Sequence, residues 1–246
     1  MKAALIDTRG LTLAAAGVTL VGSLDWRAAV GERWCVIGRN AAGKSTLLRA
    51  LAGIGEAGLQ PAGDVRWLGR PTVEWPAADA ASVRAFLPQH ASDRFPITVQ
   101  RLLEISLVRP LHEVRGLLGA LDALALADRN VLELSGGERQ RVALAQCAVQ
   151  GAPLLLLDEP VAFQDPAHQL QVAQWLTTLH QHAVVMSAHD VNWIARAATH
   201  VLALLPDGAC EQGSVAEMLD ADRLQRVYGC AWRAIDGDGG RYWVAQ

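Results

Sequence analysis

The segment Gly38-Arg-Asn-Ala-Ala-Gly43-Lys44-Ser45 has the residue types and spacing of a loop that binds a polyphosphate. Its glycines permit conformations in which backbone N–H groups point inward around the anion, and a following helix adds the positive end of its dipole. In this motif Lys44 bridges the β- and γ-phosphates, and the Ser45 hydroxyl is a ligand for Mg²⁺. A chance glycine turn is disfavoured, because the motif follows a strand-like run and opens a helical pattern. The residues predicted to contact the nucleotide here are Gly38, Arg39, Asn40, Ala41, Ala42, Gly43, Lys44, Ser45 and Thr46.

Two adjacent acids end an apolar run in Leu154-Leu-Leu-Leu-Asp158-Glu159-Pro160. Acids at the end of a buried strand are costly unless they have partners. Asp158 is placed to hold Mg²⁺, directly or through water, and Glu159 to polarise an attacking water. The alternative is a core strand whose acids only solvate its end, and the phosphate loop upstream argues against it.

A third motif, Leu134-Ser135-Gly136-Gly137-Glu138, opens a helical pattern with a serine N-cap and two glycines. A helix start of this kind also binds anions. Because a phosphate loop already serves the nucleotide, a second anion site about 90 residues downstream suggests that two ends of the molecule meet one ligand, across a dimer.

The elements that must position these motifs are short apolar strands alternating with helical patterns, which predicts an α/β fold with a mostly parallel core sheet. We expect buried strands at 34–37, 154–157, 184–187 and 201–205, a helix at 45–52, and a helix from Asp165-Pro166 to about 182. The first 30 or so residues read as antiparallel strands, and 90–150 as helical. Short helices at 215–219 and 222–228 precede a hairpin in which Trp232 and Ile235 face Tyr242 and Val244.

Bulk composition limits the function further. The chain has 246 residues, is 51% hydrophobic and carries a net charge of −3 with no basic face, so we expect one domain over 1–246 and no nucleic-acid partner. Scattered cysteines indicate reduced structural thiols. We see no signal peptide in residues 1–7 and no apolar run of the ~18 residues that a membrane helix needs.

The three motifs, in this order and spacing, resemble the ATP-binding cassette (ABC) family, whose own signature is Leu-Ser-Gly-Gly. Phosphate-loop kinases lack that signature, which argues against a small-molecule kinase. The resemblance extends from about Leu11 to Tyr228. It implies a phosphate-loop ATPase with an N-terminal antiparallel β part, a helical subdomain inserted at about 90–150, and C-terminal helices with a hairpin at about 214–246.

The resemblance also implies roles for residues outside the first two motifs. Gln89 matches the glutamine that joins the Mg²⁺ and water shell, and His189 matches the histidine that reaches the γ-phosphate. Asp165 matches the aspartate that communicates across the dimer. In this family two subunits pack head to tail, so Ser135, Gly136 and Gly137 would complete the site built on the partner's Lys44 and Glu159. Catalysis is thus expected from Glu159, His189 and Lys44, with ATP and Mg²⁺ bound.

This chain departs from the family pattern in three places. Arg39 and Ala41 replace the usual proline and glycine of the phosphate loop, and Ala41 fits easily only if its φ is not positive. The aromatic residue that commonly stacks on adenine is missing from residues 11–17, where alanines stand instead. The loop before Asp165 reads Ala162-Phe-Gln rather than Ser-Ala-Leu.

The segments 165–169 and 189–196 resemble the importers of cobalamin, haem and iron-siderophores. Three stretches, 69–75, 183–190 and 228–236, favour cobalamin, with haem or siderophore as the alternative. A soluble ABC protein acting on ribosomes or DNA is a distant alternative.

The expected partners are a second copy, integral membrane permease subunits and, indirectly, a periplasmic binding protein, which places the chain on the cytoplasmic face of the inner membrane. Four tryptophans, Trp26, Trp34, Trp175 and Trp193, are expected in the core. For Trp67 and Trp75 a surface position is left open, and no role is assigned to either.

Overall fold

The computed structural model describes residues 4–55, 58–89, 95–106, 111–238 and 240–246. Its centre is a six-stranded sheet in the order β10-β9-β3-β8-β7-β6. The strands are β3 (Arg33–Ile37), β6 (Arg84–Leu87), β7 (Leu154–Leu157), β8 (Ala183–Ser187), β9 (His200–Leu204) and β10 (Cys210–Ser214). The pairs β9-β3, β3-β8, β8-β7 and β7-β6 are parallel, and β10 is antiparallel to β9. The predicted α/β fold with a mostly parallel core is confirmed.

The carboxyl ends of the parallel strands meet at one edge of this sheet, where α/β proteins bind ligands. Four of the loops that leave the sheet there follow β3, β6, β7 and β8. These loops carry the phosphate motif, Gln89, the acidic pair and His189. Segments as far apart in the chain as Gly38 and His189 therefore converge on one place.

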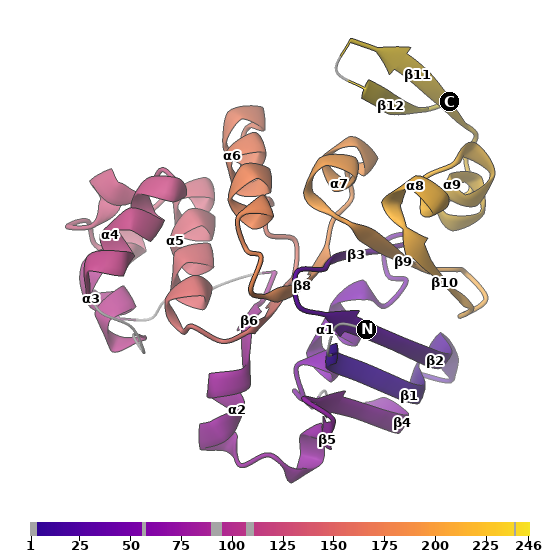
Figure 1. The fold of residues 1–246 in the computed structure, drawn as a ribbon, viewed down its shortest axis with the longest axis horizontal. Helices are drawn as coiled ribbons and strands as arrows, with labels where there is room; N and C mark the ends of the chain where they lie inside the picture. Colours follow the sequence, from indigo (N-terminus) through magenta and orange to yellow (C-terminus); the bar gives the residue numbers. More distant parts are fainter. Residues whose placement is uncertain (1–3, 56–57, 90–94, 107–110, 239) are drawn as a thin grey trace.

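An antiparallel sheet in the order β2-β1-β4-β5 covers one side of the core, as expected for the N-terminal part (Figure 1). Its strands are β1 (Ala4–Ala15), β2 (Val18–Ala29), β4 (Leu59–Trp67) and β5 (Arg70–Pro71). Trp67, for which the sequence left a surface position open, is 1% exposed and belongs to the core. Its indole Nε1 donates to the Leu51 carbonyl over 2.9 Å, and the Arg84 guanidinium lies over the ring. The four tryptophans predicted to lie in the core, Trp26, Trp34, Trp175 and Trp193, are buried.

The helices α3, α4 and α5 lie together beside the sheet and are called the helical part below (Figure 1). The bounds of the helices before the C-terminal part are α1 (Lys44–Leu51), η1 (Thr72–Glu74), α2 (Ala77–Val83), α3 (Val99–Ile105), α4 (Leu111–Ala120), η2 (Leu124–Leu126), η3 (Val131–Glu133), α5 (Gly136–Val149), α6 (Pro166–Thr177) and α7 (Val191–Ala197). Of the stretch predicted as helical, 90–94 and 107–110 lie outside the described residues. No helix in the described ranges has the length and apolar character needed to cross a bilayer.

Helix α6 ends at Thr177 rather than near 182 as predicted. The apolar periodicity continues past this point, but the Ala183 N–H donates to the Pro153 carbonyl as β8 begins. The chain therefore has to turn between α6 and β8, and the turn uses Thr178 to His182.

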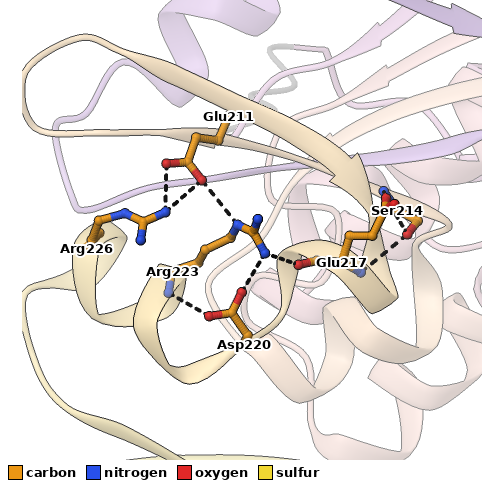
Figure 2. A network of polar contacts seen from close by, with 6 residues as sticks. All are labelled: Glu211, Ser214, Glu217, Asp220, Arg223 and Arg226. Atoms are coloured by element: carbon orange, nitrogen blue, oxygen red, sulfur yellow. Dashed lines mark hydrogen bonds and ion pairs between the residues drawn. The ribbon is translucent and has the colours of Figure 1, made fainter.

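The C-terminal part consists of α8 (Val215–Met218), α9 (Ala221–Tyr228) and the hairpin β11 (Trp232–Gly237) and β12 (Gly240–Ala245). A polar network joins α8 and α9 to β10 (Figure 2). Arg223 and Arg226 share the Glu211 carboxylate, and Arg223 also contacts Asp220 at 2.7 Å. The network therefore fixes both helices against the edge of the core sheet.

The strand pairing and the buried side chain of the hairpin differ from those predicted. Ile235 pairs with Tyr242 as expected, but Trp232 pairs with Ala245, and the Val244 side chain is 40% exposed. The buried residue is Trp243, whose backbone N–H and C=O both bond the Asn192 side chain of α7, at 2.7 and 3.0 Å. Gly239, in the predicted turn, lies outside the described residues.

Candidate functional site

A cavity of about 530 Å³ opens at the carboxyl edge of the core sheet. It is lined by Leu20, Asn40, Ala41, Gly43, Lys44, Ser45, Thr46, Gln89, Glu159 and His189. Nine of these ten residues are ones that the sequence predicts for nucleotide binding or catalysis. The structure thus brings the phosphate loop, Gln89, Glu159 and His189 to one hollow, while the rest of the predicted set lies outside its lining.

Lys44 begins α1 and points back into its own loop. Its ammonium Nζ donates to the carbonyls of Gly38 at 2.9 Å and Arg39 at 3.0 Å, and the residue is 7% exposed. Burial lowers the pKa of Lys44, and the negative charges of Glu159 and Asp158 oppose this shift. Gly43 precedes it at φ +97°, where an added Cβ would lie 3.0 Å from Leu20. The loop is therefore folded around the ammonium group of Lys44, whose positive charge attracts anions.

Two residues of the loop stand where the chain departs from the family pattern. Ala41 has φ +63°, a left-handed conformation that costs alanine more than the glycine usual at this position. Arg39 is exposed and does not line the cavity; its Nη1 lies 3.9 Å from the Cβ position of Gly229, at the end of α9. Gly38 and Ala42 also lie outside the lining, and the Gly38 carbonyl instead holds Lys44.

Asp158 is buried directly behind the cavity, with 1% of its surface exposed. The Ser187 hydroxyl donates to its Oδ1 at 2.7 Å and accepts the Glu159 backbone N–H at 2.9 Å. The second oxygen, Oδ2, is buried and has no hydrogen-bond partner among the described residues. A buried carboxylate oxygen without a donor is costly, and a bound cation would satisfy it.

Glu159 carries its carboxylate into the cavity from a left-handed backbone conformation, φ +51°. Strained backbone of this kind persists where the surroundings hold it. Here the N–H bonds Ser187, and the carbonyl accepts from the Gln140 side chain of α5 at 3.0 Å. The His189 Nε2 lies 2.9 Å from Glu159 Oε1. The two predicted catalytic side chains are thus in direct contact.

Sequence reasoning assigned no role to Ser187 or Gln140. Ser187 ends the apolar strand β8, which pairs with β7, the strand that precedes Asp158. A polar residue at the end of an apolar strand was the signal that could have indicated its role. Gln140 follows the signature motif within α5 and gave no comparable signal, because only the tertiary fold brings α5 to Glu159.

The signature motif lies away from the cavity, at the start of α5. Ser135 caps the helix: its hydroxyl accepts the Glu138 N–H, and Glu138 in turn accepts the Ser135 N–H at 2.8 Å. This second bond lowers the pKa of Glu138. Ser135 and Gly136 are exposed, and a Cβ on Gly137 would lie 2.9 Å from the Phe163 carbonyl. The start of α5, a helix start of the kind that can bind an anion, therefore lies outside the lining of its own chain's cavity.

Asp165 also lies outside the cavity lining. It caps α6, and its Oδ1 accepts both the backbone N–H and the ring Nδ1 of His168, at 3.0 and 2.9 Å. These bonds lower the pKa of Asp165, the backbone bond most. The side chain is therefore tied to α6 rather than directed to Lys44.

The comparisons with known proteins agree with this geometry. The family model described as ABC transporter matches residues 21–162. The hemin import ATP-binding protein HmuV of Ruegeria sp. (strain TM1040) is 36% identical over 87% of this chain and 86% of its own. The achromobactin transport ATP-binding protein CbrD of Dickeya dadantii (strain 3937) is 34% identical over 94% and 90%. A solved structure, an inward-facing conformation of a putative metal-chelate type ABC transporter, superposes with a TM-score of 0.81 at 23% identity, over 99% and 98% of the two chains. The chain belongs to the ABC transporter family, as an ATPase of the import type.

Proposed function

We propose that ATP binds in the 530 Å³ cavity with its phosphates on the loop from Gly38 to Thr46. Lys44 would leave the two carbonyls that it contacts and bridge the β- and γ-phosphates, while the loop N–H groups surround the anion. The observation that carries this proposal is the convergence of Lys44, Glu159 and His189 on one cavity.

We assign the hydrolysis of ATP to Glu159 and His189, whose side chains are in contact. Attack by water on the γ-phosphate depends mainly on positioning and charge stabilisation. Glu159 accepts a hydrogen bond from the attacking water and orients it, and His189, 2.9 Å from that carboxylate, donates toward the γ-phosphate. The bonds from Ser187 and Gln140 hold the Glu159 backbone while this happens.

The residues present fit a magnesium ion. The Oδ2 of Asp158 lacks a donor among the described residues, and Ser45 and Gln89 line the cavity with oxygen-bearing side chains. Such oxygens suit Mg²⁺, which also keeps waters and phosphate oxygens as ligands. The described ranges hold no group of three or more His, Cys, Asp or Glu that could hold a metal, so the ATP phosphates would have to complete the shell. The ion would neutralise charge on the phosphates.

Among the described residues that line the cavity there is no Phe, Tyr or Trp to stack on adenine. Leu20, from β2, is the largest apolar side chain in the cavity lining and packs against Gly43. We therefore assign it the apolar contact with the base.

The working unit is proposed to be a head-to-tail dimer. Ser135 and Gly136 are exposed, and together with Gly137 they form a helix start that does not line their own chain's cavity. A helix start of this kind binds anions, so it would close over the ATP held by a second copy. Asp165 lies in the loop that packs against this motif through Phe163, which supports its place at the same interface.

The test of the assigned roles is Glu159→Gln, which keeps the shape of the side chain but removes the charge. We expect ATP binding to persist, an ATP-dependent dimer to accumulate in size-exclusion chromatography, and turnover to fall at least about a hundredfold. Glu104→Gln is the control, because Glu104 is a carboxylate of α3 outside the cavity lining. Steady hydrolysis by the Glu159 variant would refute the role of this residue.

We further propose that the dimer powers uptake of a metal chelate through membrane permease subunits, at the cytoplasmic face of the inner membrane, with a periplasmic binding protein as the indirect partner. Relatives at 34% identity or more carry names that specify hemin import or achromobactin transport, which favours haem or a ferric siderophore. Cobalamin remains a second candidate, supported by the sequence patterns at 69–75, 183–190 and 228–236.

Cargo identity can be tested with the chain, its co-expressed permease and the binding protein in proteoliposomes. ATP hydrolysis should rise when the binding protein carries the correct cargo, and haem, a ferric siderophore and cobalamin are compared in parallel. Stimulation by haem or siderophore alone supports the first candidate, stimulation by cobalamin alone supports the second, and stimulation by none of the three contradicts both.

A further inference from the structure

His168, in the first turn of α6, contacts two aspartates from different parts of the fold. Its Nδ1 lies 2.9 Å from Asp165 Oδ1, and its Nε2 lies 3.1 Å from Asp122 Oδ2. Carboxylate oxygens accept hydrogen bonds, and a ring nitrogen donates when it carries the proton. The His168 ring therefore bridges two carboxylates, with one of its nitrogens against each.

The two aspartates come from the ends of two helices. Asp122 follows α4 at φ +49°, and its N–H donates to the Gly119 carbonyl at 3.2 Å. A carboxylate next to a helix C-terminus is disfavoured by the helix dipole unless a cation lies near it. The His168 ring lies against this carboxylate, so the bridge links the C-terminal end of α4 to the N-terminal end of α6.

The segment between Glu159 and α6 is held against the helical part at two further points. The Gln140 side chain of α5 donates to the Glu159 carbonyl at 3.0 Å. Gly137 approaches the Phe163 carbonyl so closely that an added Cβ would lie 2.9 Å from it. With the His168 bridge, the helical part therefore contacts this segment at its beginning, in its middle and at its end.

We infer that His168 is a positioning residue for ATP hydrolysis, because its bridge between Asp122 and Asp165 makes the placement of Glu159 depend on the placement of the helical part. The inference rests on the role proposed for Glu159. His168 itself does not line the cavity, and it acts through the backbone of the segment that it fastens. Loss of the bridge would leave the start of α6 free to shift relative to α4.

The test is a double-mutant cycle in the full chain with His168→Gln and Asp122→Asn. A positioning role predicts that each change lowers kcat about two- to fivefold, the range that one partly exposed ion pair commonly contributes, with the KM for ATP unchanged. The double variant should be no slower than the slower single variant. Asp236→Asn is the matched control: Asp236 is exposed and pairs with Arg241 at 3.0 Å in the hairpin, so kcat should not change.

Thermal unfolding of the same proteins reports the bridge separately from activity. Non-additive losses in Tm for the two changes, together with the kcat effect, support the inference. Non-additive Tm losses with wild-type kcat would show that the bridge exists but does not position Glu159, and would overturn the inference. Additive effects on both Tm and kcat would overturn it as well. Full turnover by Glu159→Gln would instead overturn the proposed role of Glu159 and, with it, the positioning claim.

Discussion

Ser187→Ala removes one hydroxyl that serves two neighbours in the site. The hydroxyl donates to Asp158 Oδ1 at 2.7 Å and accepts the Glu159 N–H at 2.9 Å, and Ser187 is fully buried. Without it, a buried carboxylate oxygen and a partly buried N–H both lose a partner. The left-handed backbone at Glu159 also loses one of the bonds that hold it.

The size of the effect follows from the two bonds. A hydrogen bond to a charged group contributes about 2 kcal/mol and one between neutral groups about 1 kcal/mol, so the loss in the free energy of unfolding should be about 3 kcal/mol. For a chain of this size, that corresponds to a fall in Tm of roughly 6–12 °C. Because Asp158 and Glu159 both shift, we also expect kcat to fall by at least about tenfold.

Thr8→Val is the matched control, because the Thr8 hydroxyl makes the same double contact elsewhere. It is buried in the antiparallel sheet, donates to the Leu24 carbonyl at 2.8 Å and accepts the Trp26 N–H at 3.1 Å. Both partners are neutral, so its loss should cost about 2 kcal/mol and leave kcat unchanged. Differential scanning calorimetry and a coupled ATPase assay measure both quantities. A Ser187→Ala protein that is destabilised like the control but hydrolyses ATP at the wild-type rate would refute the reasoning.

Three further changes test other parts of the structure. Ala41→Gly should raise the free energy of unfolding by about 1 kcal/mol, since glycine takes φ +63° without strain; a loss of stability in urea titration would contradict the left-handed conformation. Asn192→Ala should cost about 2 kcal/mol and speed proteolysis of the hairpin, because both bonds to the Trp243 backbone disappear; an unchanged cleavage rate would contradict that anchor. The Ser214 hydroxyl and N–H lower the pKa of Glu217 from its ordinary value of 4.5. These bonds therefore stabilise the folded protein above about pH 4.5, and that stabilisation is lost as pH falls through the lowered pKa. In Ser214→Ala the fall of Tm with decreasing pH should become less steep below about pH 4.5.

Local sequence signals were sufficient for much of the fold and for the parts of the site on the strand ends. The strands ending at Ile37, Leu157 and Ser187 are short apolar runs, followed by glycine, by two acids and by Ala-His respectively, and each is a strand in the structure. Because parallel strands end at one edge, the motifs that follow them had to meet, as the cavity lining confirms.

What could not be predicted depends on contacts between distant segments. The burial of Trp67 requires the Leu51 carbonyl and the Arg84 guanidinium, which come from two other elements. The hairpin turns Trp243 inward because Asn192 of α7 bonds its backbone, whereas strand alternation alone leaves either face possible. The bridge through His168 depends in the same way on Asp122, 46 residues away.

The lowered pKa of Lys44 has a practical consequence for chemical modification. The chain has only two lysines, Lys2 and Lys44, so an amine-directed acylating reagent has few side chains to attack. A lowered pKa raises the fraction of neutral, nucleophilic amine at a given pH, and bound phosphate would both shield that amine and restore its charge. The extent of acylation at Lys44, read by peptide mass spectrometry, would therefore serve as a direct footprint of nucleotide occupancy in a chain that needs no engineered label.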